Sequence, residues 1–219
     1  MAGKVPSRAV VDQGPNRGDT LVSAILYLEG GGDSKELHTR CREAFRSLLE
    51  RCGFQGRMPR LVACGGRHAV FSDFALAHAA TKAGLVAMWI DSEDSLADLE
   101  AAWAHLQTRD GWARPAAAAD EQVLFMTTCM ETWIVADRDV LSDHYGNDLQ
   151  DSALPPLAGL EKRGRHELQN MLEHATRNCT NAYQKGKRSF EILAKLNPTT
   201  LEIHLPSFVR VRRILNTHL

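Results

Sequence analysis

An acidic cluster follows a short apolar run in the middle of the chain. Residues 85–90 are apolar throughout, as in a strand buried on both faces of a parallel sheet, and Asp91, Glu93 and Asp94 come directly after them. Side chains alternate along an extended chain, so Asp91 and Glu93 are expected to point the same way, about 7 Å apart. Carboxylates this close repel one another unless a cation or a proton lies between them, and hard oxygen ligands suit Mg²⁺ or Mn²⁺.

The same acidic cluster has an ordinary structural interpretation. Asp and Glu are common at the first turn of a helix, where the helix dipole favours negative charge. The acidic cluster by itself therefore leaves both interpretations open.

Another carboxylate, Glu29, ends a second strand-like run, residues 23–28. Three glycines follow it, and glycine lets the backbone turn sharply and approach a ligand closely. Ser34 or Asp33 can then cap a helix over residues 35–52, whose apolar residues recur on one face.

Strand-like and helix-like segments alternate from this point. Further strands are predicted at residues 61–64, 85–90 and 122–126, and helices at 70–82, 96–106, 129–136, 160–176, 189–196 and 206–218, with a loop at 109–119 and a turn at 140–145. Strands connected by helix-length crossovers form a parallel sheet with helices on its faces. The fold class predicted is therefore α/β with a mainly helical C-terminal part.

The predicted organisation has three parts. Residues 1–20 read as a flexible leader, residues 21–150 as the α/β core, and residues 151–219 as a helical extension packed on the core. The chain has 219 residues and 44% hydrophobic residues, enough for a proper core.

Ligands of open parallel sheets bind beyond the carboxyl ends of the strands. Five charged residues are expected there: Glu29, Arg67, Asp91, Glu93 and, just past the fourth strand, Glu131. Each could be a surface charge or an internal ion-pair partner. Their common placement at one edge of the sheet favours a site.

Charge and cysteine content bound the class of protein further. The net charge is −1, but residues 91–151 are acidic and residues 160–195 are basic, which suits a metal site beside a polyanion surface or two halves that attract each other. The cysteines are scattered and odd in number, which predicts reduced, mostly buried thiols. The sequence contains no signal peptide and no membrane-span-length apolar run, so a cytoplasmic protein is expected.

Two of these motifs resemble a known fold. A strand that ends in Glu and Gly (LYLEGGGDS) and a later strand that ends in two acids one residue apart (WIDSED) are similar to the TOPRIM fold of topoisomerases, DnaG-type primases, OLD-family nucleases and RloB-like proteins. The fold's Glu and Asp-x-Asp positions fall on Glu29 and on Asp91 with Glu93, so here the second acid is Glu.

A longer set of motifs resembles a narrower group. EGGGDSKEL, RMPRLVACGGR, IDSED, RDGWARP, CMETWIVAD and YQKGKRSFEIL, which together cover roughly residues 23–195, are similar to a TOPRIM-like bacterial family of unknown function that is related to RloB. Members are often encoded beside an AAA-type ATPase in phage-defence loci. The resemblance implies an ATPase as protein partner and nucleic acid, DNA or RNA, as ligand, with a homo-oligomer possible.

The resemblance also implies roles for individual residues. Glu29, Asp91 and Glu93 would hold Mg²⁺ or Mn²⁺, Glu29 could serve as general base, and Glu131 could complete a second metal position. Substrate would be bound by Gly30 and Gly31, by Arg67, and by Lys185, Lys187 and Arg188. An exposed basic turn is the simpler interpretation of the last three.

The function predicted is a Mg²⁺-dependent nuclease of TOPRIM type, an effector of anti-phage defence. The alternatives are a non-catalytic nucleic-acid-binding or assembly subunit of an ATPase complex, and a small-molecule phosphotransferase or phosphohydrolase. The chain contains no Walker A motif, so it is not expected to hydrolyse ATP by itself.

Overall fold

The core of the protein is a four-stranded parallel sheet with the strand order β2-β1-β3-β4. A computed structural model describes residues 24–80 and 84–219 of the chain. The strands are β1 (Ala24–Glu29), β2 (Arg60–Gly65), β3 (Leu85–Asp91) and β4 (Val123–Met126). The predicted leader, and the ends of the predicted first strand and second helix, lie outside the described residues.

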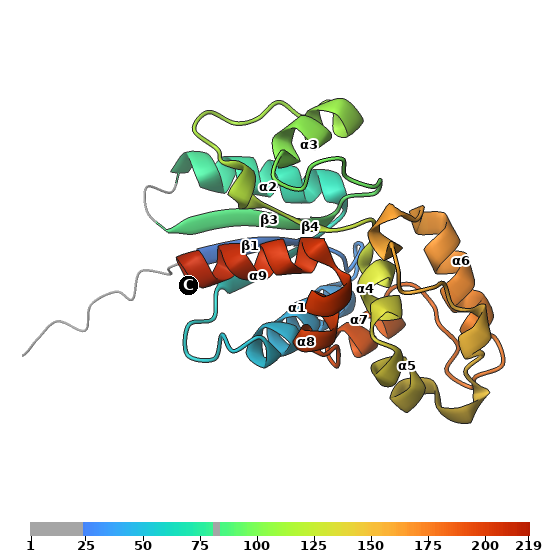
Figure 1. Cartoon of the computed structure of the whole chain (residues 1–219). Coiled ribbons are helices and arrows are strands. Elements are labelled where there is room, and N and C mark those ends of the chain that lie inside the picture. Colours follow the sequence, from blue (N-terminus) through green and yellow to red (C-terminus); the bar gives the residue numbers. More distant parts are fainter. Residues whose placement is uncertain (1–23, 81–83) are drawn as a thin grey trace, which may run out of the picture.

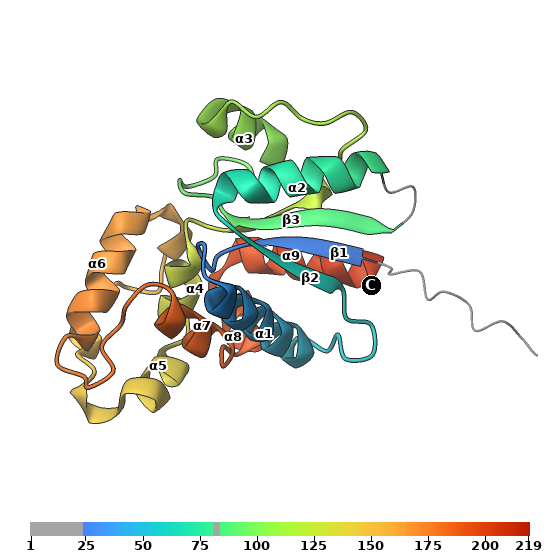
Figure 2. The ribbon, with the colours of Figure 1, turned by 180° about the vertical axis from the view of Figure 1, so that it is seen from behind.

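Helices cover both faces of the sheet (Figures 1 and 2). On one face lie α2 (Arg67–Ala80) and α3 (Ala102–Asp110), which share a hydrophobic cluster with the β3 side chains Val86, Met88 and Ile90. On the other lie α1 (Lys35–Arg51) and α9 (Pro206–His218), which share a larger cluster with Ala87 and Trp89. Because β3 is apolar on both sides, every one of its residues is buried between these two layers.

The remaining helices gather mostly beyond one end of the sheet. Figure 1 shows α4 (Met130–Ala136), α5 (Arg138–Tyr145), α6 (Arg165–Thr176) and α7 (Lys187–Leu193) grouped at the end where the strands finish. Helix α8 (Pro198–His204) precedes α9, and short 3-10 turns lie at Asp120–Gln122, Gly146–Asp148, Asp151–Ala153 and Leu160–Lys162. This group of helices lies next to the edge of the sheet where β1 ends at Glu29 and β3 ends at Asp91.

The C-terminal helices pack on the α/β core. Helix α7 contacts α1, and α9 contacts β4. The buried Arg210 of α9 donates to the carbonyl oxygens of Val123 and Asp120, both at 2.8 Å. The α/β class and the helical C-terminal region predicted from the sequence are confirmed.

The helix predicted at residues 96–106 is wrong in its position. Residues 96–101 are not helical, and α3 begins at Ala102 and continues to Asp110. Asp98 accepts a hydrogen bond from the Glu100 N–H at 2.9 Å, and the Trp103 N–H donates to Asp120 at 2.8 Å. These side-chain bonds replace a first helical turn and start the helix later. The predicted loop at 109–119 consequently begins at Gly111.

Two C-terminal elements also differ from the prediction. The helix predicted over residues 160–176 is divided, because Gly164 has an extended backbone and α6 begins only at Arg165. The turn predicted at 140–145 is the helix α5, which Asp137 caps by accepting from the Val140 N–H at 3.3 Å. The helix predicted at residues 189–196 begins earlier, at Lys187, and ends at Leu193.

The loop after β1 is held against the end of β2. Gly30 and Gly65 exchange backbone hydrogen bonds of 2.8 and 3.2 Å. A Cβ atom on Gly65 would lie 2.4 Å from the Gly32 carbonyl oxygen, so only glycine lets the loop approach this closely.

We expect Gly65→Ala to destabilise the protein far more than Gly56→Ala. Both glycines have a φ of +80°, so both substitutions carry a similar backbone strain of about 1 kcal/mol, but no described atom lies within 4 Å of a Cβ on Gly56. The steric overlap at Gly65 should add roughly 1–3 kcal/mol. Urea unfolding of the two variants measures the difference, and equal losses would mean that the loop moves freely away from β2.

Candidate active site

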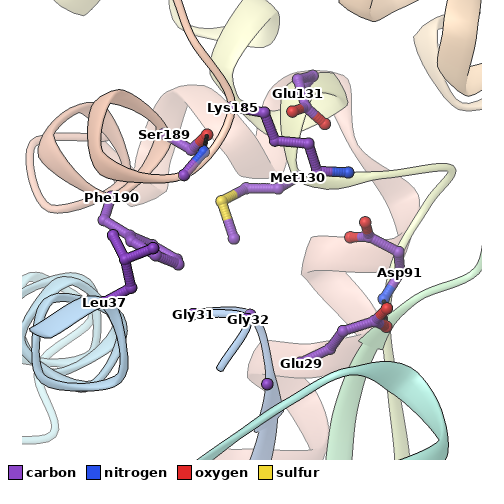
Figure 3. Close-up of a pocket in the computed structure, with 13 residues that line it drawn as sticks. Glu29, Gly31, Gly32, Leu37, Asp91, Met130, Glu131, Lys185, Ser189 and Phe190 are labelled. Carbon is purple, nitrogen blue, oxygen red and sulfur yellow. Dashed lines mark hydrogen bonds between the residues drawn. The ribbon is translucent and has the colours of Figure 1, made fainter. Parts of the chain in front are cut away.

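A cavity of about 260 Å³ lies at the carboxyl ends of β1 and β3. It is surrounded by the ends of β1 and β3, by residues 30–32, here called the glycine loop, and by residues of α1, α4 and α7 (Figure 3). Its lining residues are Glu29, Gly30, Gly31, Gly32, Leu37, Gly65, Asp91, Met130, Glu131, Lys185, Gly186, Ser189 and Phe190. The sequence prediction of a site at this edge of the sheet thus coincides with a cavity.

Glu29 is oriented toward the end of the neighbouring strand. Its Oε2 accepts a hydrogen bond from the Asp91 backbone N–H at 3.1 Å and lies 3.5 Å from Nη1 of Arg67. Burial raises the pKa of Glu29, although the positive charge of Arg67 opposes this. A carboxylate whose pKa is raised is a stronger base than an ordinary surface Glu, so it is better suited to accept a proton.

Asp91 is the most strongly perturbed group in the cavity. Burial raises its pKa well above the usual range, and the negative charges of Glu29 and Glu131 raise it further, while Lys185 and Arg67 act in the opposite direction. The residue is 8% exposed, and its Oδ1 finds no hydrogen-bond partner among the described residues. A buried carboxylate oxygen without a partner is costly, so it marks a position that a cation or a donor would stabilise.

Arg67 lies beside the cavity rather than in its lining. It forms a two-pronged ion pair with Asp110, at 2.8 and 3.0 Å, and donates to the Asp91 carbonyl oxygen. Its guanidinium also lies 5.2 Å from the ring centre of Trp112. Arg67 therefore has partners on several sides within the protein, and it fixes the two strand ends relative to one another.

Glu93 does not line the cavity beside Asp91. Strand β3 ends at Asp91, and Glu93 has a φ of +70°, so the alternation expected of an extended chain does not continue. Its carboxylate pairs with Arg109 at 3.1 Å and with Arg165 of α6. The expectation that Asp91 and Glu93 point the same way is wrong for this reason, and the geometry does not support Glu93 as a metal ligand.

Glu131 is fully buried at the start of α4 and lines the cavity. Its Oε1 accepts a hydrogen bond from the Tyr183 hydroxyl at 2.5 Å, and its Oε2 accepts one from Gln169 at 3.3 Å. Ser189 lies 2.7 Å from the same Tyr183 hydroxyl. The carboxylate is therefore held in place by the segment that carries Lys185.

The three predicted basic residues separate in the structure. Lys185 lines the cavity, and Figure 3 shows its ammonium on the side where Asp91 and Glu131 lie. Lys187 instead borders a different surface hollow beside α1, and Arg188 pairs with Glu191 at 2.8 Å. Of the candidate substrate-binding residues, the structure places Gly30, Gly31 and Lys185 in the cavity.

Several lining and supporting residues were missed by sequence reasoning. These are Leu37, Met130, Tyr183, Ser189 and Phe190. Tyr183 and Ser189 lie in the YQKGKRS motif, which was singled out for its basic residues alone. The apolar residues follow the ordinary periodicity of helix cores, so no local signal distinguishes them.

The resemblance implies a magnesium ion, and the cavity contains carboxylate oxygens, the type of donor that Mg²⁺ binds. Asp91 supplies an oxygen without a partner, and Glu29 supplies a second carboxylate close by. Within residues 24–80 and 84–219, no group of three His, Cys, Asp or Glu side chains is placed to hold a metal ion. Mg²⁺ in phosphate chemistry usually takes only one or two protein carboxylates and completes its shell with water and substrate oxygens.

The free energy of unfolding of the metal-free protein should fall as the pH rises from about 4, the ordinary pKa of a carboxyl group, through the raised pKa values of the folded protein. The pKa values of Asp91 and Glu29 are raised by folding, so the folded state binds more protons than the unfolded state. Their contribution is fully present below the unfolded pKa and is lost as the pH rises through the folded pKa. Chemical denaturation in a chelator across this range measures the slope, and a stability that rises with pH would contradict the assignment.

The fold and the cavity define a parallel α/β protein with a carboxylate-lined pocket at the carboxyl ends of its strands. Comparison with known families matches residues 28–215 to a family described as a domain of unknown function, DUF4276. The chain belongs to this family. No curated protein and no solved structure matches it. No helix among the described residues has the length and apolar character needed to cross a membrane.

Proposed function

We propose that the protein is a Mg²⁺-dependent phosphodiesterase that acts on nucleic acid, a nuclease. The observation that carries the proposal is the buried Asp91 oxygen without a partner, which borders a cavity shared with Glu29 and Lys185. A positive partner would stabilise a carboxylate in this state, and a metal cation beside a proton acceptor is an arrangement that hydrolyses phosphate esters.

Different residues of the chain can bind the metal ion, bind the phosphate and accept the proton during hydrolysis. Asp91 would hold the metal ion, which when bound would supply positive charge to the phosphate and to the leaving oxygen, and Glu29 beside it would act as the base. Lys185, whose ammonium lies on the same side of the cavity as Asp91 and Glu131, would bind a phosphate oxygen. Both structural contacts of Glu29 are made by Oε2, so its Oε1 is the oxygen that we assign to accept the proton of the attacking water. A bond from the water oxygen to phosphorus then forms as the bond to the leaving oxygen breaks.

The small size of the cavity favours a second candidate function. A volume of about 260 Å³ is slightly below the usual range for small-molecule sites, which starts at about 300 Å³, so a small phosphate ester would also suit the cavity. The non-catalytic alternative, in which the acids only pair with basic residues of the same chain, agrees with the pairing of Glu93 with Arg165. The non-catalytic alternative does not explain why the Oδ1 atom of Asp91 is buried without a partner among the described residues.

The wider biological role rests on the motif resemblance. A nuclease of this kind would be an effector of anti-phage defence in the cytoplasm, with an AAA-type ATPase as its partner and TOPRIM-type chemistry at its site. These parts of the proposal are associations rather than consequences of the geometry.

The decisive experiment is incubation of the purified chain with single-stranded and duplex DNA, RNA and small phosphate esters. Mg²⁺, Mn²⁺ or a chelator is added, with and without the product of the neighbouring gene. Cleavage of nucleic acid that requires the metal supports the nuclease, whereas turnover of small esters alone supports the second candidate. If no phosphate ester is hydrolysed under any of these conditions and no metal binds, the proposal is wrong.

A further inference from the structure

The cavity has two walls of different chemistry. One side carries the charged residues Glu29, Asp91, Glu131 and Lys185. The other side is apolar, and Figure 3 shows Leu37 and Phe190 there, with the Met130 side chain reaching in between the two walls. A site for an isolated phosphate or a metal ion alone would need only the first wall.

The apolar wall comes from helices that are far apart in the sequence. Leu37 is in the first turn of α1, Met130 begins α4, and Phe190 lies in α7. Met130 and Phe190 are 8% and 4% exposed, so their positions are fixed by packing, whereas Leu37 is only partly buried. Apolar surface that remains accessible in a pocket gains about 25 cal/mol for each Å² that a ligand covers.

The Phe190 ring is held against the glycine loop. A Cβ atom on Gly30 would lie 3.1 Å from the Cζ atom of Phe190, so the ring and the loop backbone are already in close contact. The loop backbone thus joins the apolar wall to the end of β1, where Glu29 lies. A ligand in the cavity meets an aromatic ring on one side and carboxylates with an ammonium on the other.

We infer that the cavity binds one nucleoside monophosphate unit, with its phosphate at Lys185 and the carboxylate side and its base on the wall of Leu37, Met130 and Phe190. The placement of the phosphate rests on the proposed function. Bases stack well on aromatic rings and apolar side chains whatever their sequence. In a duplex the base is paired and stacked, and it cannot reach such a wall without leaving the helix. The unit is therefore a free nucleotide or the unpaired end of a single strand.

The test measures binding rather than turnover. Adenosine 5′-monophosphate and ribose 5-phosphate are titrated into the full chain with Mg²⁺ by calorimetry, because they share the sugar phosphate and the nucleotide carries adenine in place of the anomeric hydroxyl. We expect the nucleotide to bind more tightly. Leu37→Ala should raise its Kd by about fivefold, as expected for losing part of a leucine contact, and should leave ribose 5-phosphate unchanged. Leu76→Ala, which truncates a leucine that is 73% exposed on α2, is the matched control and should change neither.

A further arm identifies the source of the unit. A single-stranded 5′-phosphorylated oligonucleotide and a blunt-ended duplex are tested as competitors of the nucleotide. Competition by the single strand but not by the duplex assigns the cavity to strand ends. If neither competes, the cavity binds free nucleotides. Equal affinity of the nucleotide and ribose 5-phosphate, with no effect of Leu37→Ala, would overturn the inference.

The outcomes separate this inference from the proposed function. If the chain cleaves closed circular duplex DNA with Mg²⁺ and Leu37→Ala changes neither binding nor cleavage, the nuclease stands and the nucleotide pocket is wrong. Base-dependent binding without any hydrolysis would keep the nucleotide pocket and remove the nuclease.

Discussion

Replacing Asp91 with Asn should abolish metal-dependent cleavage and at the same time stabilise the metal-free protein. The substitution removes the negative charge at the one position where a carboxylate oxygen is buried without a partner among the described residues. The rate should fall by at least about a hundredfold, as for other lost groups that act on transition-state charge. At a pH where the Asp91 carboxylate is ionised, the free energy of unfolding should rise by about 1–3 kcal/mol, because an unfavourable buried charge is gone.

The control for this variant is Asp94→Asn in the same loop. The Asp94 side chain is 70% exposed and pairs with Arg109 at 3.1 Å, so its loss should leave activity and stability nearly unchanged. Metal-dependent cleavage and urea unfolding are measured on both variants. A strongly destabilised Asp91→Asn protein would show that the Asp91 carboxylate is a structural partner, and the non-catalytic interpretation would then be preferred.

Tyr183→Phe should destabilise the protein by about 2–3 kcal/mol, although it removes a single oxygen atom. The Tyr183 hydroxyl donates to Glu131 at 2.5 Å, and Glu131 is fully buried. Without that donor the carboxylate keeps only the longer 3.3 Å bond from Gln169. The segment that carries Lys185 also loses its anchor to α4, so we expect the KM for substrate to rise more than kcat falls.

Tyr145→Phe provides a close control. Tyr145 and Tyr183 are both 6% exposed, but the Tyr145 hydroxyl finds no hydrogen-bond partner among the described residues. Removing it should leave the free energy of unfolding unchanged or slightly raised. Denaturant unfolding of both variants isolates the hydrogen bond to Glu131 from the general cost of deleting a buried hydroxyl. Equal effects in the two variants would show that the bond contributes nothing.

Local patterns in the sequence were sufficient for the fold class and for part of the site. Apolar runs that end in acids predict strands and their direction, and parallel strands bring their carboxyl ends to one edge. Glu29 and Asp91 lie at the same edge of the sheet, next to each other, because β1 and β3 are parallel neighbours. Gly30 and Gly31 follow Glu29 directly, so their place in the cavity was predictable too.

The remaining contacts of the site depend on the tertiary structure. Glu93 lies outside the cavity lining because its backbone has a positive φ and its carboxylate pairs with Arg165 of α6. Glu131 is held by Tyr183, which is far along the chain, and the apolar wall is assembled from α1, α4 and α7. Periodicity reports whether a residue is buried in its own helix or strand. It does not report which distant segment packs against that residue, because that depends on how all the elements fill the space around the sheet.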